Sequence, residues 1–334
     1  MGSLTFTPLH KTFGAECNGV DFQQPLCERT VTAIRDGMAD YGVLVFRRTG
    51  LDDDGHEQFA LRFGDPDLSA VAVTRRAGRL ANSKILVDVS NVGPNGRVMP
   101  VESTMAKVSR GNNLFHVDCS YNPRRAGYSI LRADQLPPPG HGGSTQFADT
   151  RTAYDELHDE FKDQIKDFVI CHSIMHSRRV GAPDIALFRW LRIRDFPHRF
   201  HRLVQQHEPS GRTNLYIASH VHHIEGMSEE DSRPIIQELL RHASRDEHVL
   251  TVEWESKGDL DNTCVMHRAG GGSFEGRYVR DLRRATVYDS SADAYGLPRP
   301  QPWGIKWTFW FFMLLHSVDK FWRSLATWGT TKRT

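Results

Sequence analysis

The chain has 334 residues, of which 39% are hydrophobic, 10% aromatic and 25% charged, and this average composition excludes global disorder and collagen-like or coiled-coil structure. Its 42 Lys and Arg balance 41 Asp and Glu, so the net charge of +1 gives no electrostatic reason to expect a nucleic-acid partner. Five widely spaced Cys, and an N-terminus without a secretory pattern, favour a reduced, cytoplasmic protein.

Hydrophobic periodicity predicts short helices and strands that do not alternate regularly. In chain order these are a helix over 28–41, a strand over 43–46, a helix over 54–63, strands over 84–90 and 127–134, helices over 152–168 and 229–243, and strands over 248–254 and 278–288. Because no βαβ alternation runs along the chain, we expect one α+β domain built on an antiparallel sheet or barrel. Pro234 is expected only in the first turn of its helix.

The 17 His suggest metal chemistry. Non-haem iron enzymes often use two His and one carboxylate, and two of these ligands can come from His-x-Asp or His-x-Glu on a strand, where residues two apart point the same way. Random composition alone would give about two such motifs, so their presence does not decide the question. The chain has His116-Val-Asp118, His158-Asp-Glu160 and His223-Ile-Glu225.

Sequence context separates these motifs. His158 and Glu160 lie in a predicted helix, where residues two apart do not face each other, so we expect a solvated surface there. The motif at 223–225 lies beside two further His and remains a rival site. His116 and Asp118 follow an apolar pair and a polar Gly-Asn-Asn segment, as expected where a strand opens into a site.

The stretch LFHVDCSYNPRRAGYSILRADQLPPPGHGGSTQFADTRTAYDEL (114–157) closely resembles the TauD/TfdA family of iron(II)- and 2-oxoglutarate-dependent dioxygenases, most of all the branch that contains 2,4-dichlorophenoxyacetate dioxygenase. Further matching segments are 14–22, 41–47, 59–65, 216–244 and 262–289. The resemblance implies a double-stranded β-helix, or jelly-roll, core with flanking helices. It implies a dioxygenase domain over 1–295 and leaves 296–334 as an aromatic-rich C-terminal tail.

The resemblance also implies roles for particular residues. His116, Asp118 and His267 would bind Fe(II). Arg280 would pair with the distal carboxylate of 2-oxoglutarate, to which Thr145 would donate its hydroxyl. A buried dianion needs a planar, bidentate cation, which Arg supplies and Lys does not.

Four further residues match positions at which family members contact substrate: Arg284, Asn112, His220 and Arg97. Arg284 follows Arg280 by four residues, which on a strand puts both side chains on the same face. Without the resemblance, this Arg cluster would be interpreted as solvated surface, Thr145 as a turn residue and His267 as a core histidine.

The implied reaction consumes 2-oxoglutarate and O2, releases succinate and CO2, and oxidises a small organic substrate, expected to be a carboxylic acid that becomes hydroxylated. Two alternatives stay open: an inactive relative that binds a ligand, and a zinc hydrolase that uses the same His, Asp and His. A buried Arg280 would argue against the hydrolase. The sequence does not name the substrate, exclude desaturation or cyclisation, or fix the oligomeric state, so a homo-oligomer stays open.

Two segments depart from the family pattern. Residues 303–328 contain an apolar run of about nine residues, too short for the ~20 that span a bilayer. We expect a helix packed on the domain or on a partner there, with membrane-surface contact as the alternative. Family members also carry three more residues after Leu260, so the strand over 252–261 is expected to be short or irregular, with His267 still near the metal position.

Overall fold

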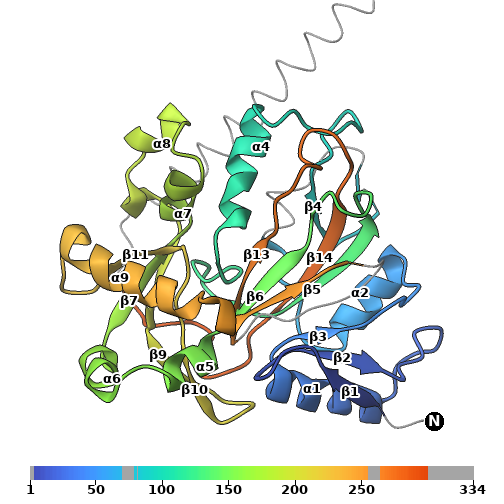
Figure 1. Ribbon diagram of the computed structural model, residues 1–334, viewed down its shortest axis with the longest axis horizontal. Coiled ribbons are helices and arrows are strands. Elements are labelled where there is room, and N and C mark those ends of the chain that lie inside the picture. Colours follow the sequence, from blue (N-terminus) through green and yellow to red (C-terminus); the bar gives the residue numbers. More distant parts are fainter. Residues whose placement is uncertain (1–3, 70–78, 81, 255–263, 300–334) are drawn as a thin grey trace, which may run out of the picture.

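The computed structural model describes residues 4–69, 79–80, 82–254 and 264–299, and it is a mixed α and β structure (Figure 1). Its helices are α1 (Glu28–Tyr41), α2 (Asp53–Leu61), α4 (Thr104–Ser109), α5 (Thr150–Asp155), α6 (Asp159–Ile165), α7 (Ile174–Gly181), α8 (Ala186–Trp190) and α9 (Glu229–Ala243), with 3-10 turns η1 (Arg110–Asn113), η2 (Ile193–Asp195) and η3 (Asp246–His248). Its strands are β1 (Thr5–Pro8), β2 (Ala15–Asn18), β3 (Leu44–Val45), β4 (Val87–Ser90), β5 (Ala126–Gln135), β6 (Thr145–Asp149), β7 (Val169–Ser173), β8 (His198–Arg202), β9 (Val204–His207), β10 (Arg212–Leu215), β11 (Val221–Ile224), β12 (Val249–Val252), β13 (Val265–Ala269) and β14 (Asp281–Tyr288).

The longest strands, β5 and β14, pair antiparallel, and β4 completes their sheet on the other side of β14. Successive side chains of these strands point to opposite faces. Ile130 and Val287 belong to a core cluster that also contains side chains of α1 and α2. The other face carries Ser129, Leu131 and Arg284, in the register Thr286↔Ser129 and Arg284↔Leu131.

A second small sheet faces that polar side. Its central strand, β6, pairs antiparallel with β12 on one side and with β13 on the other. Phe147 and Val265 of this sheet share a core cluster against which Leu131 packs. His267 is two residues from Val265 and therefore points to the same face. The two sheets thus bring His267 and Arg284 to their facing sides.

A third sheet, in the order β11-β7-β8, lies beside this pair and is covered by α9 and α7 (Figure 1). Ile236 and Leu239 of α9 join the core cluster formed with β7 and β11. The remaining pairings are β1-β2-β3 and β9-β10. No helix in the described part of the chain is both long and apolar enough to cross a membrane.

Most predicted elements are confirmed, and most strands are shorter than predicted, whereas β5 extends one residue further at each end. The helices predicted over 28–41 and 229–243 have those bounds, and Gly42 ends the first with φ 69°, a conformation that glycine adopts without steric cost. The expectation for Pro234 was wrong, because it is the sixth residue of α9 and so lies beyond the first turn. Three strands start later than expected, namely those predicted over 84–90, 248–254 and 278–288. The strand predicted over 248–254 also ends earlier, at Val252.

The single helix predicted over 152–168 was wrong. The chain forms α5 and α6 with a break at 156–158, where His158 has an extended backbone and precedes two acidic residues in the first turn of α6. Acidic side chains at a helix N-terminus are favourable. The apolar side chains still reach one cluster, in which Leu157 and Ile165 are buried. The pattern therefore indicated the buried side correctly but not the break.

The predictions for two segments cannot be followed in the structure. Most of the strand expected over 252–261 and the whole segment 303–328 lie outside the described residues.

Candidate active site

Two histidines far apart in the sequence are joined by their backbones. His116 and His267 form an isolated antiparallel bridge, in which each backbone N–H donates to the carbonyl of the other at 2.9 Å. Their rings lie 4.2 Å apart between centroids. Directly opposite residues of a bridge present their side chains on one face. The extended stretch at His116 is only this bridge, shorter than the strand that the His-x-Asp motif predicted.

Asp118 completes this group. Its Oδ1 lies 4.0 Å from His116 Nε2, and its Oδ2 lies 3.7 Å from His267 Nε2. A turn begins at this residue, and the next one, Cys119, has φ 55°, which is unusual for a residue other than glycine. Ser129 Oγ donates to Asp118 Oδ2 at 2.7 Å and so holds the carboxylate in place.

The protonation states of these three residues suit metal binding. Burial lowers the pKa of His116 and lowers that of His267 to about 3, so both rings are neutral. Burial alone would raise the pKa of Asp118, but the positive charge of Arg284 and the nearby imidazoles bring it below its ordinary value. His116 Nδ1 lies 2.7 Å from the Leu114 carbonyl and must carry the proton that it donates there. Its Nε2 is therefore a lone pair facing Asp118, and two neutral imidazoles with one carboxylate are the donors that a non-haem iron ion prefers.

A buried cation lies nearby, in the turn before β14. Arg280 is 7% exposed, and its Nε donates to the Gly143 carbonyl at 2.8 Å. Burial lowers the pKa of Arg280 to about 10. Among the described residues no carboxylate pairs with it. A charge taken out of water without a partner is costly, so this guanidinium is suited to an anionic ligand.

Thr145 lies beside Arg280 and has its hydroxyl hydrogen available. Its Oγ1 accepts from Trp254 Nε1 at 3.1 Å and lies 3.4 Å from Arg280 Nη2. Both neighbours can only donate, so the Thr145 hydroxyl must donate elsewhere. Thr145 pairs with Ala269, two residues along β13 from His267, and so points to the same face as that ring.

The structure places three of the four predicted substrate residues close to this group. Arg284 forms an ion pair with Asp118. The ring of His220 is buried and lies 5.8 Å from that of His116, between centroids. Asn112 is in η1, which lies beside β13. Arg97 is in an exposed turn, and no described side-chain contact joins it to the group.

Sequence reasoning missed a second partly buried cation. Arg178 of α7 donates to the Val108 carbonyl at 3.1 Å and has no acidic partner among the described residues. Burial lowers its pKa, and its charge in turn lowers the pKa values of His116 and His220. Its segment packs closely on η1, because a Cβ added at Gly181 would lie 2.6 Å from the Gly111 Cα. No motif marked Arg178, since a helix residue next to another Arg resembles ordinary surface.

The two other His-x-acid motifs do not join the group. His158 and Glu160 are exposed, as predicted. Glu225 forms a two-fold ion pair with Arg299, at 2.6 and 2.8 Å. His223 contacts another histidine, His222, at 2.8 Å. The rival site therefore does not share a ligand with the His116 group.

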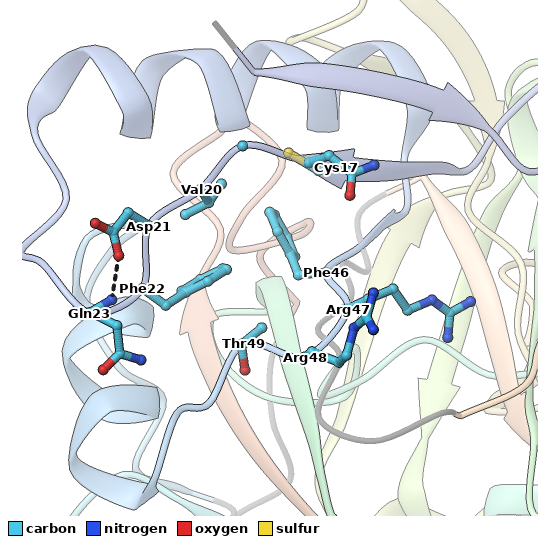
Figure 2. Close-up of a pocket in the computed structure, with 11 residues that line it drawn as sticks. Cys17, Val20, Asp21, Phe22, Gln23, Phe46, Arg47, Arg48 and Thr49 are labelled. Atoms are coloured by element: carbon cyan, nitrogen blue, oxygen red, sulfur yellow. Dashed lines mark hydrogen bonds between the residues drawn. The ribbon is translucent and has the colours of Figure 1, made fainter. Parts of the chain in front are cut away.

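A shallow hollow of about 230 Å³ lies elsewhere, between residues 17–23 and 46–49 (Figure 2). Phe22 and Phe46 line it and contact each other edge to face, with ring centroids 5.7 Å apart. Burial raises the pKa of the Cys17 thiol to about 12, which keeps it unreactive. None of the predicted site residues lines this hollow.

Comparisons with known proteins identify the family of the chain. Residues 5–286 match the family model described as taurine catabolism dioxygenase TauD, TfdA family. An alpha-ketoglutarate-dependent 2,4-dichlorophenoxyacetate dioxygenase of Cupriavidus pinatubonensis is 33% identical over 293 residues, which cover 86% of this chain and 99% of that protein. A (S)-phenoxypropionate/alpha-ketoglutarate-dioxygenase of Sphingobium herbicidovorans is 30% identical over 80% of this chain and 89% of its own length.

A solved structure of a similar protein supports the same family. The crystal structure of AAD-2 in complex with Mn(II) and N-oxalylglycine superposes with a TM-score of 0.75 at 32% identity, and the match covers 86% of this chain and 99% of that one. The family model spans far more than half of the chain, and relatives above 30% identity align over nearly their whole length. The chain therefore belongs to the TauD/TfdA family of dioxygenases.

Proposed function

We propose that this chain is an iron(II)- and 2-oxoglutarate-dependent dioxygenase in which His116, Asp118 and His267 hold the metal. Their ligand atoms all lie within 4.8 Å of one another, and the two rings are neutral with a carboxylate between them. Three protein ligands leave positions open for co-substrate and oxygen. Bound there, iron(II) supplies the redox chemistry that couples decarboxylation of 2-oxoglutarate to oxidation of a substrate by O2.

The distal carboxylate of 2-oxoglutarate is assigned to Arg280 and Thr145. The guanidinium is buried without an acid, and the Thr145 hydroxyl has a hydrogen to donate. The bound carboxylate would neutralise the Arg280 guanidinium and accept the hydrogen bond of the Thr145 hydroxyl. This is the observation that carries the proposal, because a zinc hydrolase with the same three metal ligands has no use for a buried, unpaired guanidinium beside them.

We assign the substrate to the class of small carboxylic acids. Arg284 pairs with Asp118, and the charge of Arg178 acts on His220, whose ring lies 5.8 Å from that of His116. The relatives named above act on aryloxyalkanoic acids, whose carboxylate would suit these cations. Arg284 contacts Asp118, and a metal ion bound to Asp118 would leave the Arg284 guanidinium available to an anion.

The two facing sheets, β4-β14-β5 and β12-β6-β13, are further proposed to be the two walls of a double-stranded β-helix in one dioxygenase domain over 1–295. This arrangement fits the positions of the site residues, because His267 lies on β13, Arg284 lies on β14 of the facing sheet, and His116 and Asp118 lie in the segment before β5.

The test measures succinate release from 2-oxoglutarate with and without added iron(II), against a panel of aryloxyacetic and simple aliphatic acids. We expect iron-dependent release that increases with an accepted acid, and its loss in the Asp118→Ala variant. His158→Ala, which changes an exposed His of a similar motif, is the matched control and should keep full turnover. Iron-independent turnover, or equal turnover in Asp118→Ala and the unchanged chain, would reject the proposal.

A further inference from the structure

A second group of metal-ligating side chains lies outside the proposed active site. His176 of α7, His222 of β11 and Glu229, the first residue of α9, have ligand atoms that all lie within 4.8 Å of one another. His222 Nε2 is 3.1 Å from Glu229 Oε2, and the two His rings are 5.2 Å apart between centroids. Three elements that are separate in the sequence therefore bring two imidazoles and one carboxylate to one place.

His176 has the feature expected of a ligand without its ion. Its ring is largely buried, and burial lowers its pKa to about 4, so it is neutral. Neither ring nitrogen has a hydrogen-bond partner in the part of the chain that the structure describes. An imidazole whose two ring nitrogens are engaged by no described protein group has a lone pair available for a metal ion.

The surroundings leave the required atoms accessible. Glu229 Oε1 faces Arg233 at 3.9 Å, while Oε2 faces His222, so one oxygen of the carboxylate is directed into the group. Glu229 is exposed and the two His are half-buried, which leaves an entry path from solvent. Ligand atoms of a tetrahedral zinc site lie about 3.4 Å apart, so small rotations of His176 would close the group around an ion.

A fourth residue is placed to orient one ligand. His223 Nδ1 lies 2.8 Å from His222 Nδ1, so one of the two must donate to the other. In the metal-free group His222 Nε2 carries a proton toward Glu229, and His223 is the donor. A metal on Nε2 requires the opposite tautomer, in which His222 Nδ1 donates and the proton of His223 moves to its Nε2. The number of protons is unchanged, and His223 becomes the outer partner that metal-bound imidazoles usually have.

We propose that His176, His222 and Glu229 form a second divalent-metal site, of the zinc class, separate from the His116 group. Two nitrogens and one oxygen suit Zn²⁺ or Co²⁺ and disfavour Mg²⁺ and Ca²⁺, which prefer oxygen. The ion would tie α7 to β11 and to the start of α9. Because α7 also carries Arg178, the site would brace the helix that bears one of the proposed substrate cations.

The experiment counts zinc per chain in full-length protein that carries no affinity tag, after chelator treatment and dialysis against Zn²⁺. We expect two ions per chain in the unchanged protein and one in His222→Ala. Glu229→Gln changes an exposed residue and keeps its side-chain size, so this variant should also bind one and should keep iron-dependent 2-oxoglutarate turnover. His158→Ala is the matched control and should bind two. With Co²⁺ in place of zinc, the absorption of a tetrahedral site should disappear in both site variants.

An equal number of zinc ions per chain in the unchanged protein and in both site variants would overturn the proposal. His223→Phe separates a positioning role from mere packing. It leaves the three ligands in place, and we expect zinc affinity at this site to fall about 10- to 100-fold while two ions still bind at saturating zinc. Unchanged affinity in that variant would remove His223 from the site.

Discussion

Replacing Arg280 with Lys separates the charge of this residue from its shape. The Arg280 guanidinium is buried, its Nε is used by the Gly143 carbonyl, and no carboxylate pairs with it among the described residues. Lys keeps one positive charge but cannot form two parallel hydrogen bonds to a carboxylate. The variant should therefore bind iron(II) as before and bind 2-oxoglutarate weakly.

The magnitude follows from one lost charge-assisted hydrogen bond. Such a bond contributes about 1.5–3 kcal/mol, which corresponds to roughly 10- to 150-fold in the dissociation constant. The assay is the dependence of succinate release on 2-oxoglutarate concentration, supported by the shift in melting temperature on adding 2-oxoglutarate to the iron-loaded protein. The apparent affinity for 2-oxoglutarate and the melting-temperature shift should both decrease, because a ligand that binds more weakly stabilises the folded protein less.

Arg283→Lys is the matched control. Arg283 lies three residues further along, points to the opposite face of β14, and pairs with Asp53 and Asp134. We expect its 2-oxoglutarate dependence to stay unchanged. An Arg280→Lys variant with the same apparent affinity as the control would show that Arg280 does not hold the co-substrate, and the reasoning from its unpaired charge would fail.

Three other perturbations have defined outcomes. Thr145→Val removes the hydroxyl and leaves Trp254 Nε1 without its acceptor, so 2-oxoglutarate affinity and melting temperature should both fall, whereas Thr145→Ser should preserve them. Arg178→Met should raise the KM for an anionic substrate while the KM for 2-oxoglutarate changes little; equal effects on both would exclude a substrate role. Burial lowers the pKa of His56 from 6.5 to about 3. Between these two pH values the unfolded chain binds a proton at His56 that the folded chain does not, so the free energy of unfolding falls as pH falls through this range. His56→Gln, which can still donate to the Ile130 carbonyl, should reduce the slope of unfolding free energy against pH near pH 5 by about 1.4 kcal/mol per pH unit in urea titrations, and an unchanged slope would contradict the buried neutral state.

The sequence predicted those features that depend on local periodicity. The helix over 28–41 has its buried side at Val31, Ile34 and Met38, at helical spacing, and it ends at a glycine. The break after Asp155 escaped prediction because the apolar pattern continues through it, and periodicity does not distinguish one helix from two that bury the same side. The ends of most other strands were predicted too wide for a similar reason, since apolar side chains stay buried beyond the last ladder hydrogen bond, but β5 exceeds its predicted range by one residue at each end.

Predicting the site needed more than local pattern. His267 carries no signal of its own, and it was found only through the resemblance to a family. In the structure it meets His116 through two backbone hydrogen bonds between segments 151 positions apart, which no spacing rule anticipates. Arg178 and His176 were missed because their significance lies in missing partners, and a sequence does not show which partners a side chain lacks.

The segment after Leu260 raises a last question, because the resemblance to the family implies that it is three residues shorter than the usual pattern. The structure argues that His267 does not depend on that segment. Strand β13 is held to β6 by a continuous register from Val265↔Asp149 to Ala269↔Thr145, and the bridge to His116 lies within it. A slip of this register by one residue would turn His267 away from Asp118 and move Met266, which is fully buried, to the opposite face.

Inserting Val-Met-Trp after Leu260 should therefore leave iron affinity unchanged. If the new Trp enters the core, it should raise stability by up to about 3–5 kcal/mol, a large share of a typical 5–15 kcal/mol. Iron titration and thermal unfolding measure the two effects, and a Gly-Ser-Gly insertion at the same place controls for length. Iron affinity that changes with Val-Met-Trp but not with Gly-Ser-Gly would mean that the segment, and not the β6 register, positions His267. A lower melting temperature and turnover with Val-Met-Trp would mean that the chain is adapted to the shorter segment.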